Sequence, residues 1–312
     1  MPLALLALAA FLVLPASALA TADDLQQAID GKLGETVPIN TMWVVVAAVF
    51  VLLMQAGFAM LEIGFSRAKN AGTGVAKILT NLSIAAICYW AVGFAFAFGS
   101  ADVLGISGLI LGSNGFFLQL SGSLDPETGG HLGLPVMSVS NATVEAKFLF
   151  QFAFLAVSLA IVWGSTLERI KYGAYVIYAI VFASIIYPIG SHWVFGGGWL
   201  QNGDTPLLPT GMQDFAGSTV IHLIGATGAL AALLLIGPRR GKYGPDGKPR
   251  AIPGHSMPLV GLGTLILFIG WFGFNAGSTL GVTDVRFAEV AMITLLGACG
   301  GVLGAFVMGA IK

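Results

Sequence analysis

Long apolar stretches, separated by short polar or charged segments, recur along most of the chain. A helix needs about 20 mainly apolar residues to cross the roughly 30 Å hydrocarbon core of a bilayer, because its backbone polar groups must be hydrogen-bonded within the segment. Seven stretches approach or exceed this length, at about 42–65, 78–98, 148–166, 172–189, 215–236, 258–275 and 288–311. The pattern predicts an all-α protein, a polytopic membrane helix bundle with about seven transmembrane helices.

An eighth span at 103–120 is the alternative to this count, because that segment is uncharged and moderately apolar. It is also rich in glycine and contains Asn114, and a crossing there would reverse the side on which every later loop lies. We therefore expect an external hairpin at about 100–146, which is either re-entrant or held at the surface.

Basic residues test the count independently, since the cytoplasmic loops of membrane proteins are enriched in Lys and Arg. Of the 14 Lys and Arg residues, only Lys32, Lys147 and Arg286 lie on the other side of the predicted bundle. The remaining ones follow the first, third, fifth and seventh spans: Arg67, Lys69, Lys77, Arg169, Lys171, Arg239, Arg240, Lys242, Lys248, Arg250 and Lys312. We expect a multi-pass protein of the cell membrane with an external N-terminus, and with the C-terminus of this chain in the cytoplasm.

The first 20 residues form a short apolar segment that ends in Ala-Leu-Ala before a polar stretch. Such a segment is typical of a cleaved signal peptide, although its beginning lacks Lys and Arg, and an uncleaved helix is the alternative. The predicted organisation is a signal peptide at 1–20, an external segment at 21–41 and a membrane domain at 42–312.

Composition agrees with a membrane location, since 56% of the residues are hydrophobic and only 9% are charged. Soluble domains carry about a quarter charged residues.

Cys88 and Cys299 both lie in apolar stretches, so we expect free thiols and no disulfide. Nothing in the charge pattern supports nucleic-acid binding. The sequence has no His-Glu-x-x-His pair, no Gly-x-Ser-x-Gly elbow and no cysteine ligand set, so we expect no enzyme activity, no metal and no cofactor.

Ionisable side chains within spans are costly in lipid and usually face a bundle interior or a cavity. The candidates are Glu62, Glu168, His192, Asp214 and His222. His222 follows Asp214 by eight residues, which places it about 12 Å deeper along a helix. A neutral imidazole there suits a small hydrogen-bonding solute, but it equally suits a purely structural pairing with a neighbouring helix. Asp214 suits a helix cap, and it would also attract an arriving cation.

Two aromatic clusters begin or end spans on the same predicted side. Phe150 and Phe154 share one helix face at the start of the third span, and Trp271 and Phe274 lie beside Ser278 at the end of the sixth. Ring faces attract a desolvated cation by about 2 kcal/mol, so the clusters predict an external cation site if they converge. Core packing and an aromatic belt at the lipid interface are the alternatives.

These segments together resemble the family of ammonium transporters, methylammonium permeases and Rhesus proteins. The matching stretches are MQAGFAMLEIGFSRAKN at 54–70, FQFAF at 150–154, LERIKY at 167–172, YPIGSHWVFGGGWL at 187–200, DFAGSTVIH at 214–222 and GWFGFNAGS at 270–278. The resemblance implies an eleven-helix fold with inverted five-helix repeats, of which this chain would hold the first seven helices. It also implies a homotrimer with one pore in each subunit.

The resemblance further implies roles for individual residues. Phe154 and Phe274 would form a stacked gate, Ser278 would bind ammonium, Asp214 would support that site, and His222 would be the first pore histidine. Phe150 and Trp271 would line the passage. Phe195 stands where the family often has tryptophan, so cation recruitment would be weaker or shared with other rings. The helix that would carry the second pore histidine is not represented, and we therefore expect the 312-residue chain alone to conduct poorly.

An ammonium sensor is the alternative function, in which the same helices bind ammonium and a cytoplasmic module signals. A cytoplasmic regulatory protein is a further expected partner, beside the lipid bilayer, ammonium and ammonia.

Overall fold

The computed structural model describes residues 36–100, 110–119, 134–201 and 210–311, and these ranges are helical apart from connecting turns and one isolated β-bridge. Seven segments within them are long and apolar enough to cross a membrane: Thr36–Phe65, Ala68–Phe98, Val144–Ser165, Tyr172–Phe195, Ser218–Ile236, Met257–Thr279 and Arg286–Ile311. The predicted all-α membrane bundle and its seven spans are confirmed for the described part of the chain.

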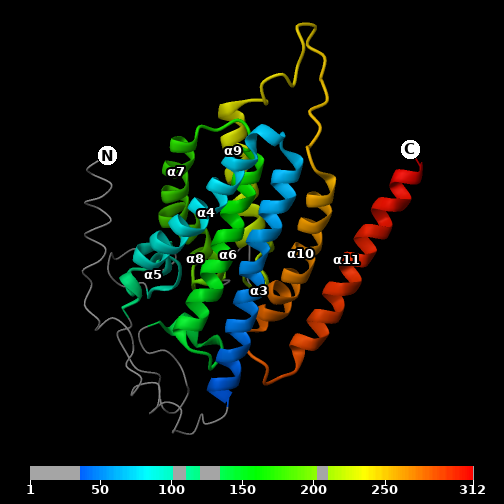
Figure 1. Ribbon diagram of the computed structural model, residues 1–312. Coiled ribbons are helices and arrows are strands. Elements are labelled where there is room, and N and C mark those ends of the chain that lie inside the picture. Colours follow the sequence, from blue (N-terminus) through cyan, green and yellow to red (C-terminus); the bar gives the residue numbers. More distant parts are fainter. Residues whose placement is uncertain (1–35, 101–109, 120–133, 202–209, 312) are drawn as a thin grey trace.

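Three of the spans contain a π-helical turn. The elements, labelled in Figure 1, are α3 (Thr36–Phe65), α4 (Ala71–Cys88), α5 (Phe94–Phe98), α6 (Val144–Ser165), α7 (Tyr172–Val181), α8 (Tyr187–Phe195), α9 (Ile224–Ile236), α10 (Met257–Asn275) and α11 (Arg286–Ile311). The π-helical turns join α4 to α5, join α7 to α8 and precede α9. Such turns leave carbonyl groups without their usual partners and are frequent at functional sites.

Helix α6 lies at the centre of the bundle, in contact with α3, α4 and α9 (Figure 1). In its most apolar stretch of 18 residues, 72% of the residues are buried, which is the highest share among the seven spans. Its sequence permits this position, because apolar residues continue all around the helix and leave no polar face that must reach water.

Helices α3 and α10 make the most extensive helix contact in the described structure. Glycine allows the backbones to approach: a Cβ atom on Gly263 would lie 2.5 Å from the amide nitrogen of Leu61 and 2.6 Å from the carbonyl oxygen of Gly57. Membrane helices associate through such small residues because lipid offers no hydrophobic driving force between helices.

Helix α11 is the least buried of the seven spans, since only 6% of the residues in its most apolar stretch of 18 residues are buried. In Figure 1 it runs along the edge of the bundle, and it contacts α10 and the 3₁₀ turn Ala276–Thr279. Apolar side chains along its length, including Val302 and Phe306, are therefore exposed to lipid or to neighbouring protein.

Two lysines lie inside helices where the sequence had placed them in loops. The second span begins near Ala68 and not at 78, so Lys77 belongs to α4 and is 2% exposed. Lys147 belongs to α6, and its ammonium group donates to the carbonyl oxygens of Met137 and Ser140. Carbonyl groups beside Lys147 and the ring of Tyr175 beside Lys77 accommodate these cations within helices. A hydropathy pattern does not show such contacts. The first span also begins earlier than expected, at Thr36.

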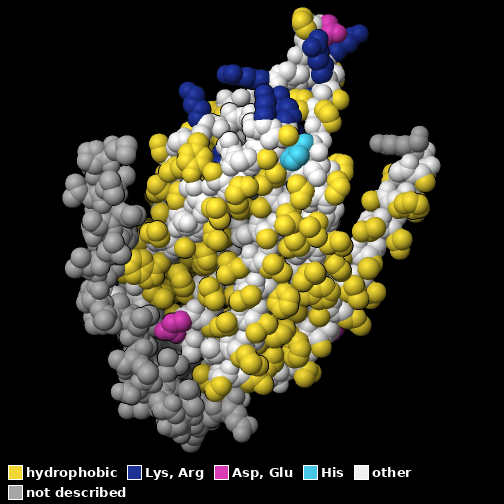
Figure 2. All heavy atoms as spheres, viewed as in Figure 1, with side chains coloured by type: hydrophobic (Ala, Val, Ile, Leu, Met, Phe, Trp, Pro, Cys, Tyr) yellow, Lys and Arg dark blue, Asp and Glu magenta, His cyan; other side chains and the backbone are white. Residues whose placement is uncertain are grey.

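Figure 2 shows Lys and Arg gathered at one end of the visible face, and hydrophobic side chains over most of the remainder. We call this end, formed by residues 66–71, 166–171 and 237–256, the basic end. The predicted signal peptide at 1–20 and about half of the predicted external hairpin lie outside the described residues. Within 110–119 the helical structure is a short 3₁₀ turn at Phe116–Leu118, so this described segment contains no eighth span.

Candidate functional site

Aromatic rings from α6 and α10 stack in the half of the bundle away from the basic end. The rings of Phe154 and Phe274 are nearly parallel, at 19°, with centroids 4.4 Å apart. Phe150 lies 4.4 Å from Phe154, and Trp271 stacks on Phe274 at 5.5 Å. Because Phe150, Phe154 and Phe274 are each only 1% exposed, this is a buried stack and not an aromatic belt at the lipid interface.

The imidazole of His222 borders the aromatic stack. Its ring centroid is 5.5 Å from that of Phe274 and 5.5 Å from that of Trp271. The Nδ1 atom lies 3.2 Å from the carbonyl oxygen of Gly217. A carbonyl oxygen only accepts hydrogen bonds, so this contact favours the tautomer that carries its proton on Nδ1 and leaves Nε2 as an acceptor.

The carboxylate of Asp214 organises the start of the fifth span. Its Oδ1 atom accepts from the amides of Gly217 and Ser218 at 2.6 and 2.9 Å, and its Oδ2 atom accepts from the amides of Thr219 and Val220 at 2.9 and 3.0 Å. Gly217 has a φ of 95°, and a Cβ atom there would lie 1.6 Å from the Cδ1 atom of Ile221. The predicted helix-capping role of Asp214 is therefore present in the structure, at a turn that requires glycine.

Ser278 and Phe195 occupy different surroundings. The Ser278 hydroxyl donates its proton to the carbonyl oxygen of Phe274 at 2.7 Å, so any further hydrogen bond that it makes is as an acceptor. Phe195 ends α8 and packs, half-buried, against the apolar core. Within the described part of the chain its ring pairs with no other ring, so the structure does not join it to the stack of Phe154 and Phe274.

The sequence interpretation missed Ser158 as part of this region. Its hydroxyl donates to the carbonyl oxygen of Ile221 at 2.8 Å, in the π-helical turn that carries His222. Serine in a membrane helix is an ordinary hydrogen-bonding residue, and only the three-dimensional contact between α6 and this turn reveals its partner. His192, in contrast, directs Nδ1 to the carbonyl oxygen of Ala97 at 3.0 Å, which is a helix-pairing contact.

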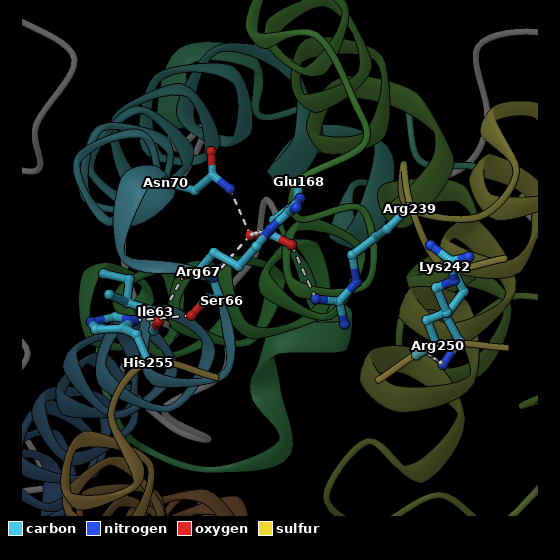
Figure 3. Close-up of polar contacts among 9 residues, drawn as sticks. All are labelled: Ile63, Ser66, Arg67, Asn70, Glu168, Arg239, Lys242, Arg250 and His255. Carbon is cyan, nitrogen blue, oxygen red and sulfur yellow. Dashed lines mark hydrogen bonds and ion pairs between the residues drawn. The ribbon is translucent and has the colours of Figure 1, made fainter. Parts of the chain in front are cut away.

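A separate polar cluster ties three connecting segments together at the basic end (Figure 3). Glu168, whose side chain has no exposed surface, forms ion pairs of 3.1 Å with Arg67 and with Arg239. It also accepts from the Arg67 amide at 2.9 Å and from the Asn70 side chain at 2.6 Å. Burial raises the pKa of Glu168, but these hydrogen bonds outweigh burial and hold the pKa at about 2.

The two polar regions therefore differ in chemistry. The cluster around Glu168 saturates its charge with internal partners, whereas the region around His222 presents ring faces, a hydroxyl acceptor and an imidazole acceptor between three spans. Among the described residues, no group of three or more His, Cys, Asp or Glu side chains is arranged to hold a metal ion. The fold and the site define a polytopic membrane protein in which stacked aromatic rings and a histidine converge between helices.

Comparison with known proteins shows the family to which the chain belongs. Residues 42–312 match the sequence profile described as Ammonium Transporter Family. The chain is 42% identical over 277 residues to ammonium transporter Amt2 of Archaeoglobus fulgidus, covering 88% of this chain and 54% of that protein. It is 37% identical over 268 residues to ammonium transporter 3 of Dictyostelium discoideum, covering 84% of this chain and 55% of that protein.

Solved structures agree with the sequence comparison. A structure described as Sensor Amt Protein superimposes with a TM-score of 0.75 at 35% identity, covering 88% of this chain and 62% of that one. Mep2 of Candida albicans superimposes with a TM-score of 0.62 at 26% identity, covering 80% of this chain and 50% of that one. This chain belongs to the ammonium transporter family, and it spans about half the length of the curated relatives that it matches.

Proposed function

We propose that this protein transports ammonium across the cell membrane through the region between α6, α10 and the turn that precedes α9. In this proposal, ammonium is recruited at the ring faces and at Ser278, releases a proton to external water, and passes as ammonia between Phe154 and Phe274 to His222. Phe150 and Trp271 line the passage, and Phe195 contributes to recruitment.

The observation that carries the proposal is the contact of His222 with the stacked rings, at 5.5 Å from both Phe274 and Trp271. Three spans that are distant in the sequence meet at this point. The rings attract a cation through their negative faces, and the neighbouring imidazole accepts a hydrogen bond through Nε2. Ammonium and ammonia both donate hydrogen bonds, so this pair of environments suits a solute that enters charged and continues neutral.

An apolar passage also accounts for selectivity. Transfer of a bare ion into an apolar environment costs far more than transfer of a neutral polar molecule. Potassium and sodium have no proton to release and stay charged, whereas ammonium becomes neutral on losing one. We therefore place selectivity in the apolar gate formed by Phe154 and Phe274, and not in a ring of carbonyl ligands.

The assembly and sidedness belong to the same proposal. We propose a homotrimer with the aromatic stack toward the outside, the basic end in the cytoplasm and a cytoplasmic regulatory protein as a partner. The clustering of Lys and Arg at one end supports the orientation. The exposed apolar length of α11 supports further protein contacts within the membrane.

Reconstitution of the full gene product into liposomes tests the transport proposal directly. The variant His222→Ala is expected to lower the rate of ammonium entry at least about tenfold, which corresponds to ~1.4 kcal/mol of barrier height. Phe274→Leu is expected to lower ammonium selectivity over potassium. His255→Ala is the matched control, because that ring contacts the Ser66 carbonyl oxygen at the basic end. Wild-type rate and selectivity in both site variants would contradict the proposal.

A sensing role is the second candidate, and the structural similarity to Sensor Amt Protein favours it. In this case the site would bind ammonium and change conformation without sustained flux. Trp271, which contacts His222, supplies an intrinsic fluorescence probe. A change in tryptophan fluorescence that saturates with ammonium and is lost in Trp271→Phe, together with no flux in liposomes, would support sensing over transport.

A further inference from the structure

A small polar pocket opens at the basic end, next to the Glu168 cluster. Its volume is about 210 Å³, and it lies between the start of α4 and the connection from α6 to α7. Its polar lining consists of Asn70, Thr73, Lys77, Glu168, Arg169 and Lys171. The volume is below the range of roughly 300–1,000 Å³ that is typical of drug-sized ligands, so the pocket suits a small group.

Lys77 is the feature that distinguishes this pocket from an ordinary surface depression. The residue is only 2% exposed, yet it lines the pocket from within α4. Its ammonium group forms no hydrogen bond or ion pair with the part of the chain that the structure describes; its contact is with the ring of Tyr175, 5.7 Å from the centroid. A buried cation normally has a charged or hydrogen-bonding partner, and a ring face supplies only part of that stabilisation.

The charges around the pocket do not cancel. Glu168 is the acidic residue of the lining, and both of its oxygens are already occupied by Arg67, Asn70 and Arg239. Arg169 donates from Nη1 to the carbonyl oxygen of Gly237 at 3.1 Å, while its Nε atom has no partner within the described structure. Burial, followed by the nearby charge of Arg239, lowers the pKa of Arg169. With Lys77 and the exposed Lys171, the lining therefore has excess positive charge.

The start of α4 adds a further attraction for an anion. This helix has 18 residues, and its N-cap residue Asn70 makes no side-chain cap hydrogen bond. The positive end of the helix dipole is consequently not neutralised by a capping side chain, and Thr73 in the first turn lines the pocket. A helix N-terminus combined with lysine and arginine is a favourable environment for a phosphate group.

We propose that this pocket binds the phosphoryl group of a lipid headgroup or of a soluble phosphate ester, with Lys77 as its buried ligand and Arg169, Lys171 and the start of α4 as further donors. The site is separate from the aromatic stack and does not depend on the transport proposal. The lipid source is a phosphomonoester headgroup, as in phosphatidic acid, so both sources present an acceptor-rich phosphoryl group that can carry two negative charges. The simpler alternative is that Lys77 only extends its ammonium group toward water through the pocket.

Thermal unfolding of the full gene product in phosphatidylcholine nanodiscs separates these possibilities. Inorganic phosphate is titrated at constant ionic strength against chloride, and a parallel sample contains phosphatidic acid in the nanodisc. The variants are Lys77→Met and Lys171→Met, and the matched control is Lys248→Met on the exposed segment of the basic end. We expect the pocket variants to need about tenfold more of the stabilising probe than the wild-type protein for the same effect. The control variant should need the wild-type concentration.

Each outcome decides the proposal. Stabilisation by inorganic phosphate that both pocket variants weaken supports a soluble phosphate ester as ligand. Stabilisation by phosphatidic acid alone, with the same dependence on the variants, supports a lipid headgroup. The proposal is overturned if neither probe stabilises the protein. It is also overturned if the pocket variants are stabilised at the same probe concentration as the wild-type protein. If Lys77→Met does not fold, the exposed Lys171→Met decides the result.

Discussion

The carboxylate of Asp214 and the imidazole of His222 are connected through one backbone group. Asp214 accepts from the amide of Gly217, and the carbonyl oxygen of the same residue lies 3.2 Å from Nδ1 of His222. The turn held by Asp214 therefore fixes the position of the carbonyl that selects the imidazole tautomer. This gives Asp214 a positioning role toward His222, beside any electrostatic effect on an arriving cation.

The connection predicts different results for two replacements of Asp214. Asp214→Ala removes the acceptors of four backbone amides and is expected to lower the free energy of unfolding by about 2 kcal/mol, and to reduce transport. Asp214→Asn retains one acceptor oxygen, so an intermediate loss of stability is expected. Thermal unfolding and liposome flux on both variants measure this. Equal stability of the alanine variant and the wild-type protein would contradict the capping role.

Glu168 acts between elements, because it joins the connections α3–α4, α6–α7 and the segment after α9 (Figure 3). Its folded-state pKa of about 2 lies below the ordinary value of 4.5. The protonated form is therefore disfavoured in the folded protein. Glu168 contributes its full stabilisation above about pH 4.5, and that contribution is lost as the pH falls toward 2.

Glu168→Gln is expected to lower the free energy of unfolding by about 3 kcal/mol at pH 7, because it leaves two arginines without their counter-charge. The difference between the wild-type protein and the variant should shrink as the pH falls from about 4.5 toward 2, where the wild-type carboxyl also becomes neutral. Thermal unfolding in detergent over this pH range measures the effect. Glu289→Gln, an exposed carboxyl group on α11, is the control. A difference that does not change with pH would refute the argument.

The contact between α3 and α10 depends on close backbone approach at Gly263. Gly263→Ala places a methyl group against the backbone of α3 and is expected to lower the free energy of unfolding by about 1–3 kcal/mol. Gly301→Ala on α11 is the matched control, since a Cβ atom there meets nothing within 4 Å. The control should be neutral or slightly stabilising, because alanine favours a helix over glycine. Similar destabilisation of both variants in a denaturant titration would argue against tight packing at this crossing.

Apolar periodicity and length predicted the spans well, because a bilayer imposes a minimum length on every crossing. The meeting of Phe154, Phe274 and His222 followed from the resemblance, and their rings are neighbours in the structure, whereas their roles in transport stay a prediction. The partners of Glu168 were not predictable, since Arg67 is 101 residues away and no local pattern links them. Phe195 lies at the end of α8 and pairs with no ring among the described residues, so its role in cation recruitment stays a prediction from the resemblance.

The whole molecule is polarised along the direction of its helices. The aromatic stack lies in one half of the bundle, and Lys and Arg gather at the other end (Figure 2). Arg286 is near the opposite end and lies over the ring of Phe215, 5.2 Å from the centroid. Lys147, near the start of α6, lies at the same end, and these two basic residues are far fewer than those at the basic end. The positive-inside rule therefore predicts one orientation for the bundle.

Cysteine accessibility in intact cells tests this orientation. With Cys88 and Cys299 replaced by alanine, Lys248→Cys reports on the basic end and Asp284→Cys on the connection between α10 and α11. A membrane-impermeant maleimide is expected to label Asp284→Cys in intact cells, and Lys248→Cys only after permeabilisation. The expectation follows from the cost of moving clustered Lys and Arg across the membrane. Labelling with the reverse pattern would place the aromatic stack toward the cytoplasm, and recruitment of external ammonium by its rings could not then be the first step.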